Sequence, residues 1–97
     1  MLLKELLQDI PGIAETRGSL DTEIGVLSIN SRDKAKHGLF FCISGAKFDA
    51  HDFAAQAVEN GCVALVVSRF LDDVAAPQVR AENVRSAMAY FAAAFYG

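Results

Sequence analysis

The chain has 97 residues, 53% of them hydrophobic, and a formal net charge of −3 with histidine neutral. This length predicts a single domain (residues 1–97), and the apolar share is too large for a disordered chain. Charges of both signs are spread along the sequence, and no apolar run approaches the roughly 20 residues that span a bilayer. We therefore expect neither nucleic acid nor a membrane as a partner.

The chain contains two cysteines, Cys42 and Cys62, and each lies inside an apolar run. This pattern predicts two reduced, buried thiols, because a disulfide scaffold of this size carries more cysteines. The N-terminal stretch MLLKELLQDIPG has acidic residues within its apolar pattern, which argues against a secretory signal. Both observations favour a cytoplasmic protein.

The first half of the chain predicts one helix and two strands. Leucines and an isoleucine share one face of an N-terminal helix that Pro11-Gly12 ends, whereas residues 13–23 are polar and predict no regular element. IGVLSIN (24–30) predicts a strand from its branched residues. LFFCIS (39–44) is a continuous apolar run, which is typical of a strand covered on both faces.

The second half predicts a helix, two strands and a final helix. Asp49 is a good N-cap for the first of these helices, Asn60-Gly61 is a left-handed stop, and His51 is expected to be exposed in the first turn. CVALVVS (62–68) predicts a buried strand and QVRA (78–81) a short one. The predicted apolar stripe of the first helix is Phe53, Ala54, Ala57 and Val58.

Asn83 is the expected N-cap of the final helix, VRSAMAYFAAAFYG (84–97). Its predicted core-facing residues are Val84, Ala87, Met88, Phe91 and Phe95. The segment 39–68 forms a β-α-β unit, so its two strands are expected to be parallel with a right-handed crossover. The predicted fold class is α/β, with a small sheet of about four or five strands flanked by helices.

Several catalytic motifs are missing from the sequence. It has no G-x-x-x-x-G-K-[ST] phosphate loop, no G-x-G-x-x-G and no G-x-S-x-G. His37 and His51 have no cysteine or acidic cluster that completes a metal site. We therefore expect no catalytic residue, metal or cofactor within this chain itself.

Polar residues follow two neighbouring predicted strands. Asn30, Ser31 and Arg32 end the first, and the segment 44–47 (Ser-Gly-Ala-Lys) ends the second. Ligands of open α/β sheets bind beyond the carboxyl ends of strands, and Gly45 permits a close approach of backbone to ligand or a sharp turn. The cations at this edge suit a phosphate or diphosphate ester. They are Arg32, Lys34, Lys36 and Lys47.

Each of these residues also has a purely structural interpretation. Ser31 is as well placed to cap a turn as to bind a ligand, and Arg32 is a natural partner for a local carboxylate. The lysines fit a solvated loop, and Gly45 fits a simple turn. From the residues alone, the chain is a small α/β domain with a candidate anion site.

The stretch N-S-R, the apolar strand that follows it and F-D-A-H-D-F-A-A-Q-A-V-E-N-G-C-V-A-L-V-V resemble the N-terminal domain of the Mur ligases. These are ATP-dependent amide ligases of peptidoglycan precursor synthesis in the bacterial cytoplasm. The family pattern is roughly D-S-R, G-x-L-F-V-A-I-x-G and D-G-x-x-F-x-x-x-A-x-x-x-G-A-x-A-x-V. The similarity extends from about Ile24 over nearly the whole remaining chain.

The resemblance implies that this chain is the first domain of a longer ligase. Such a domain holds the uridine-diphosphate end of UDP-MurNAc-L-Ala-D-Glu, and its partner is the central ATPase domain of the same parent chain. ATP and Mg²⁺ belong to that central domain, so the resemblance implies no cofactor here and no activity of the isolated domain. The expected roles are in cell-wall biogenesis, cell shape and cell division.

Two branches of the family share this domain type. LLKELLQDI and VRAENVRSAMAYFAAAFYG resemble the ligase that adds the third, diamino acid residue, whereas FDAHDFAAQA also resembles the ligase that adds D-Ala-D-Ala. We predict the first, with the second as the alternative. A ligand-free interaction module is a third hypothesis, and whether the added residue is diaminopimelate or lysine is left open.

The resemblance also assigns residues to the substrate. Ser31 matches the serine that hydrogen-bonds the uridine nucleotide, and Ile29 matches an apolar residue that lines the same site. Gly45 precedes the segment that borders the uracil, which corresponds to Ala46, Lys47 and Phe48. Asn30 and Arg32 are candidates for phosphate or turn support, although Asn30 stands where the family usually has aspartate.

Overall fold

Five strands form one sheet in the computed structural model, which describes residues 1–97, and their order is β1-β5-β4-β3-β2. The neighbouring pairs from β2 to β5 are parallel, and only β1 runs antiparallel, beside β5. The predicted α/β class and its parallel β-α-β unit are therefore confirmed. The strands are β1 (Ile13–Arg17), β2 (Val26–Ser28), β3 (Gly38–Phe41), β4 (Cys62–Val67) and β5 (Gln78–Ala81).

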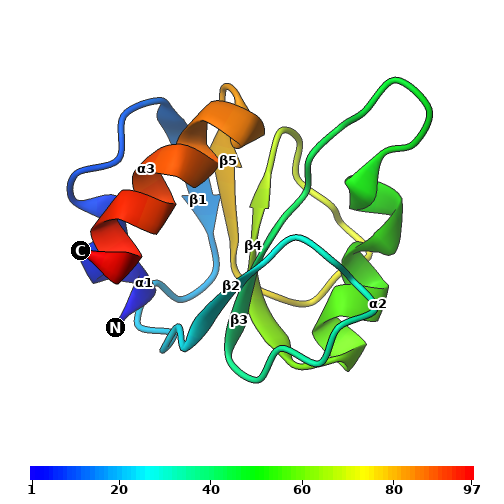
Figure 1. The fold of residues 1–97 in the computed structure, drawn as a ribbon, viewed down its shortest axis with the longest axis horizontal. Helices are drawn as coiled ribbons and strands as arrows, with labels where there is room; N and C mark the ends of the chain where they lie inside the picture. The colour runs from blue at the N-terminus through cyan, green and yellow to red at the C-terminus, as the bar shows by residue number, and fades with distance from the viewer.

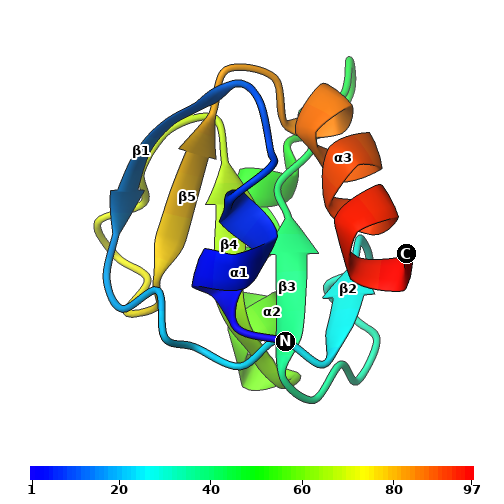
Figure 2. The same cartoon turned by 90° about the vertical axis from the view of Figure 1, so that its left-hand side faces the viewer.

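Helices cover both faces of the sheet (Figure 1). The helices are α1 (Leu3–Leu7), the 3₁₀ turn η1 (Ala50–Phe53), α2 (Ala54–Glu59) and α3 (Val84–Tyr96). Figure 2 shows α1 and α3 together in front of the sheet, with α2 behind it. None of the helices combines the length and apolar character that crossing a membrane requires.

The two central strands, β3 and β4, contribute to two separate cores. Successive side chains of a strand point to opposite faces. Leu39 and Phe41 accordingly pack with α1 and α3, whereas Phe40 and Cys42 pack with α2. All four residues of β3 are buried, as the continuous apolar run predicts.

The strand β1 was not expected, because residues 13–23 are mostly polar. Only Ile13 is half-buried, and the other four residues of β1 are exposed. The strand forms because its backbone pairs with β5, for example Thr16 with Val79. An edge strand with one solvated face needs no apolar run, so the composition gave no signal.

The helix predicted from Asp49 is interrupted, and two expectations about it are wrong. It begins with η1, whose three residues per turn shift the faces relative to an α-helix. His51 is consequently buried at 4% exposure, whereas Phe53 is 41% exposed. Ala54 and Ala57 still pack in the core, as predicted.

The ends of the last two helices follow the sequence signals. The Asp49 side chain accepts the backbone N–H of His51, and the Asn83 side chain accepts that of Ser86. Gly61 adopts φ 113°, the left-handed region expected of a residue that ends a helix. The predicted face of α3 packs against the sheet as well.

Replacing Phe91 by alanine tests the packing of α3. The ring is fully buried, and its centroid lies 5.5 Å from that of Phe41 in an edge-on arrangement. We expect Phe91→Ala to lower the free energy of unfolding by about 3–5 kcal/mol in urea titrations. Tyr90→Ala is the control, because Tyr90 is half-exposed on the same helix and its loss is expected to cost less than about 1 kcal/mol. Equal losses would contradict this packing.

Both cysteines are free and buried, as predicted. Burial raises the pKa of the Cys42 thiol to about 12, with a smaller contribution from the nearby Asp49 charge. Burial also raises the pKa of Cys62. Because the thiolate is the reactive form, we expect neither cysteine of the folded chain to react appreciably with a disulfide reagent near pH 8. Both are expected to react in concentrated guanidinium chloride, and rapid labelling of the folded chain would contradict their burial.

Candidate functional site

A cavity of about 480 Å³ opens beyond the carboxyl ends of β2 and β3. This is the edge of a parallel sheet where ligands bind. Its lining comes from the loop after β2, from β3, from the segment that leads into η1 and from η1 itself. The lining residues are Ile29, Asn30, Ser31, Arg32, Phe40, Phe48, Ala50 and Phe53.

Large apolar side chains of this lining face solvent. Ile29 is 65% exposed and Phe48 is 62% exposed. The rings of Phe48 and Phe53 meet edge-on with centroids 6.0 Å apart. Exposed apolar groups that converge on a cavity mark a binding surface, and aromatic rings of this kind suit a planar ligand.

A turn over residues 30–33 forms one wall of the cavity. The Asn30 side-chain oxygen accepts the backbone N–H of Arg32 at 3.0 Å, and the Asn30 backbone oxygen accepts the N–H of Asp33 at 3.2 Å. Asparagine commonly stabilises a turn in this way. The amide therefore orders the turn without the negative charge of the aspartate that is usual in the family pattern.

Ser31 is connected to α2 through two hydrogen bonds. Its hydroxyl donates to Gln56 Oε1 at 2.7 Å, and its backbone oxygen accepts from Asn60 Nδ2 at 2.7 Å. Asn60 also accepts the Lys34 ammonium at 3.1 Å. The loop after β2 is thus attached to the solvent-facing side of the crossover helix.

A tight loop carries Phe48 to the cavity. Ser44 and Asp49 form an antiparallel bridge, and the Gly45 N–H donates to the Phe48 oxygen at 2.8 Å. Figure 1 shows this loop projecting beyond the end of β3. A Cβ at Gly45 would lie 3.3 Å from the Phe48 oxygen, so a glycine allows this close turn.

The Asp49 carboxylate holds the base of this loop. Its Oδ1 accepts the Ser44 hydroxyl at 3.1 Å, the His51 backbone N–H at 3.0 Å and His51 Nδ1 at 2.6 Å. Its Oδ2 accepts Arg69 at 2.9 Å. Partial burial favours the neutral form of Asp49, but the hydrogen bonds from His51 and Arg69 outweigh it and hold the pKa of this carboxyl well below its usual range.

The buried ring of His51 completes this cluster. Its Nε2 accepts the backbone N–H of Ser68 at 3.0 Å, which places the ring proton on Nδ1, facing Asp49. The Ser68 hydroxyl lies 3.3 Å from the same Nε2. Although aspartate, histidine and serine occur together, the backbone N–H already occupies the histidine lone pair. The cluster therefore joins the ends of β3 and β4 and is not arranged to activate the serine.

The cations beside the cavity make no ion pairs with the chain. Arg32 forms no ion pair, so the alternative interpretation that it is a partner of a local carboxylate is not supported. Lys47, on the loop after β3, likewise has no acidic partner. The prediction that Lys36 stands at this edge is wrong, because Lys36 packs against Gly61 at the amino end of β4. Arg32 is thus a cation of the cavity lining that no carboxylate of the chain pairs with, although the whole chain has a net charge of −3.

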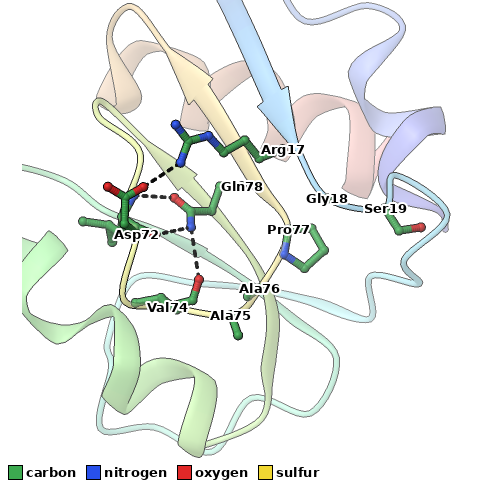
Figure 3. Close-up of a pocket in the computed structure, with 10 residues that line it drawn as sticks. Arg17, Gly18, Ser19, Asp72, Val74, Ala75, Ala76, Pro77 and Gln78 are labelled. Atoms are coloured by element: carbon green, nitrogen blue, oxygen red, sulfur yellow. Dashed lines mark hydrogen bonds and ion pairs between the residues drawn. The ribbon is translucent and has the colours of Figure 1, made fainter.

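A second hollow, of about 400 Å³, lies at the amino end of β5 (Figure 3). Arg17 pairs with Asp72 at 2.8 Å there, and its guanidinium carbon lies 4.1 Å from the centroid of the Phe70 ring. The buried amide of Gln78 bonds to the backbone of Leu71 and of Val74. These polar groups already have partners within the chain, so they are not free to bind a ligand. The hollow is lined mainly by the β4–β5 connection, and we do not assign it a function.

The structure brings five of the predicted site residues to the cavity and leaves three outside its lining. The five are Ile29, Asn30, Ser31, Arg32 and Phe48. Gly45, Ala46 and Lys47 are exposed along the projecting loop. Phe40, Ala50 and Phe53 line the cavity without having been predicted. The one signal for Phe53 was a second phenylalanine shortly after Phe48 at the start of a helix.

Comparisons with known proteins place the chain in a family. The family model described as "Mur ligase family, catalytic domain" matches residues 23–96. The UDP-N-acetylmuramoyl-L-alanyl-D-glutamate--2,6-diaminopimelate ligase of Geobacillus thermodenitrificans is 45% identical over all 97 residues. Its namesake from Syntrophomonas wolfei is 43% identical over an alignment of 98 residues that covers the whole chain. The chain belongs to the Mur ligase family.

The chain corresponds to only part of these relatives, since it spans 19% and 20% of their lengths. Two crystal structures of MurF from Acinetobacter baumannii superpose on it with TM-scores of 0.79 and 0.80 at 29% identity. The superpositions cover 96% of this chain and 20% of the MurF chains. The fold is thus that of a segment found in larger ligases.

The hydrogen bonds of Asp49 predict a pH dependence of stability. The folded-state pKa of Asp49 lies below its unfolded value, so its contribution is present above the ordinary aspartate pKa of about 3.9 and is lost as the pH falls further. Urea unfolding of wild type and Asp49→Asn is expected to differ most near neutral pH and to converge in acid.

Asp73→Asn is the matched control, because Asp73 is exposed and makes no side-chain hydrogen bond. This variant is expected to follow the wild-type curve. A difference between wild type and Asp49→Asn that stays constant down to about pH 2 would show that the ionised carboxylate is not what stabilises the loop.

Proposed function

We propose that this chain is the substrate-binding first domain of an ATP-dependent ligase that adds diaminopimelate to UDP-MurNAc-L-Ala-D-Glu. In this proposal the cavity beside Ser31 holds the uridine end of that substrate. The observation that carries it is the convergence of Ile29, Ser31 and Phe48 in one cavity. These three residues, which resembled the uridine-binding positions of the family, come from two separate loops.

The chemistry of the lining supports a nucleobase. Ile29, Phe48 and Phe53 offer apolar and aromatic surface for the faces of a planar ring, while Ser31 offers a polar group for its edge. In the proposal, backbone N–H groups of the exposed residues Ala46 and Lys47 donate to the C=O groups of uracil. A volume of about 480 Å³ lies within the range of small-ligand sites.

The charge of the cavity rim supports the diphosphate. Arg32 lines the cavity, and neither it nor Lys47 is neutralised by a carboxylate of the chain. A guanidinium forms strong charge-assisted hydrogen bonds with phosphate oxygens. The substrate would therefore extend from the aromatic cavity across a positively charged rim.

The ligation chemistry lies outside this chain in the proposal. The central domain of the parent would bind ATP and Mg²⁺ and form an acyl phosphate on the D-Glu side-chain carboxylate. The incoming amine would then attack the carbonyl and release phosphate. This first domain would act by holding the nucleotide end of the substrate, in the bacterial cytoplasm, and would be inactive alone.

The D-Ala-D-Ala-adding ligase is the second candidate, because the MurF structures superpose over 96% of this chain. The curated diaminopimelate ligases are more similar in sequence, at 45% against 29% identity. We therefore favour the first candidate. Recognition of the added amino acid would lie in the remainder of the parent, where the two candidates differ.

Amide NMR titration of the chain tests the uridine site. We expect UMP and UDP-MurNAc to shift residues 29–32 and 44–48 and Phe53, more strongly than CMP does. The expected affinity is weak, with Kd on the order of millimolar, because the rest of the substrate has no partner here. Ser31→Ala is expected to weaken the shifts.

Ser86→Ala is the matched control, since Ser86 is an exposed serine in the first turn of α3. It is expected to titrate like wild type. Shifts centred on the hollow of Figure 3 would contradict the assigned site. No response to any of these nucleotides would favour the ligand-free interaction module.

A further inference from the structure

Gln56 is the partner of the Ser31 hydroxyl, yet it does not line the cavity. Gln56 lies on the exposed side of α2, and Asn60 is the residue that caps the carboxyl end of the same helix. Gln56 holds the side chain of Ser31 and Asn60 holds its backbone, both at 2.7 Å. Ser31 is thus restrained at two points by a helix that is itself packed against the sheet.

The direction of the Ser31–Gln56 hydrogen bond limits what Ser31 offers a ligand. A serine hydroxyl has one proton and two acceptor lone pairs. The structure commits that proton to Gln56 Oε1. Ser31 therefore presents only a lone pair to the cavity and favours a ligand group that donates a hydrogen bond.

From this geometry we infer that Gln56 is a positioning residue for nucleotide specificity. It keeps Ser31 an acceptor, which pairs with the ring N–H that uracil has and cytosine lacks. The inference rests on the proposed uridine site. It adds that Gln56, which does not line the cavity, determines whether the Ser31 hydroxyl donates or accepts a hydrogen bond there. Cytosine has a lone pair at that ring position. It therefore cannot form a hydrogen bond with a Ser31 oxygen that only accepts, and its binding is weaker.

Variants of Gln56 separate this role from a general structural one. Gln56→Leu removes the acceptor, so the Ser31 hydroxyl is free to rotate and to donate to cytosine. Gln56→Glu keeps an acceptor and cannot donate, so the Ser31 hydroxyl still directs its proton to residue 56 and accepts from the ligand. Ala55→Leu is the control for a leucine on the exposed side of the same helix.

The readout is the ratio of UMP to CMP affinity, measured by NMR titration. Both ligands have the same charge, so the extra charge of Gln56→Glu cancels in the ratio. We expect Gln56→Leu to lower the ratio roughly fivefold, the size of one ordinary hydrogen bond, while Gln56→Glu and Ala55→Leu keep it. In a Ser31→Ala background, Gln56→Leu is expected to have no further effect.

Two results would overturn the inference. In the first, Gln56→Leu leaves the wild-type ratio unchanged. In the second, it lowers the ratio equally with and without the Ser31 hydroxyl, which would mean that Gln56 acts elsewhere.

A ligand-free measurement separates failure of this inference from failure of the proposed function. The urea midpoints of Ser31→Ala, Gln56→Leu and the double variant report whether the two side chains interact. Additive midpoints would overturn the inference even if uridine binds. Coupled midpoints in a chain that binds no nucleotide would contradict the proposed function and reduce the pair to a structural contact.

Discussion

The burial of β3 and β4 on both faces dictates how the other elements are arranged. Two central strands with apolar side chains on both sides need cover on both sides. Helices α1 and α3 supply one layer, and α2, which connects the two strands, supplies the other. Because the connection between parallel strands must return to the starting edge, the loops after β2, β3 and β4 leave the sheet at the same edge.

The Asp49 carboxylate turns this common edge into a defined surface. Its two oxygens accept four hydrogen bonds, which come from Ser44, His51 and Arg69. The ring of His51 extends the cluster to the backbone at Ser68. The loop that carries Phe48 is therefore held before any ligand arrives, which reduces the entropy that binding must overcome.

Helix α2 links the core to the candidate site. Its inward residues, Ala54 and Ala57, are small and bring the helix close to the sheet. Its outward residue Gln56 and its C-cap residue Asn60 reach the loop that contains Ser31. A helix of only six residues thus fixes both the packing of one face and the orientation of a cavity-lining hydroxyl.

Features that depend on neighbours along the chain could be predicted from the sequence. The buried character of β3 and β4, the caps at Asp49 and Asn83 and the left-handed end at Gly61 all follow from short-range patterns. The family pattern also pointed to Ile29, Ser31 and Phe48, which do meet in one cavity.

Features that depend on partners distant in the sequence became visible in the folded chain alone. The polar β1 becomes a strand because β5 lies beside it, and η1 rotates His51 inward and Phe53 outward. Gln56 meets Ser31 across 25 positions of sequence. No local periodicity encodes such a pairing, because the packing of α2 on the sheet sets the distance between the two side chains.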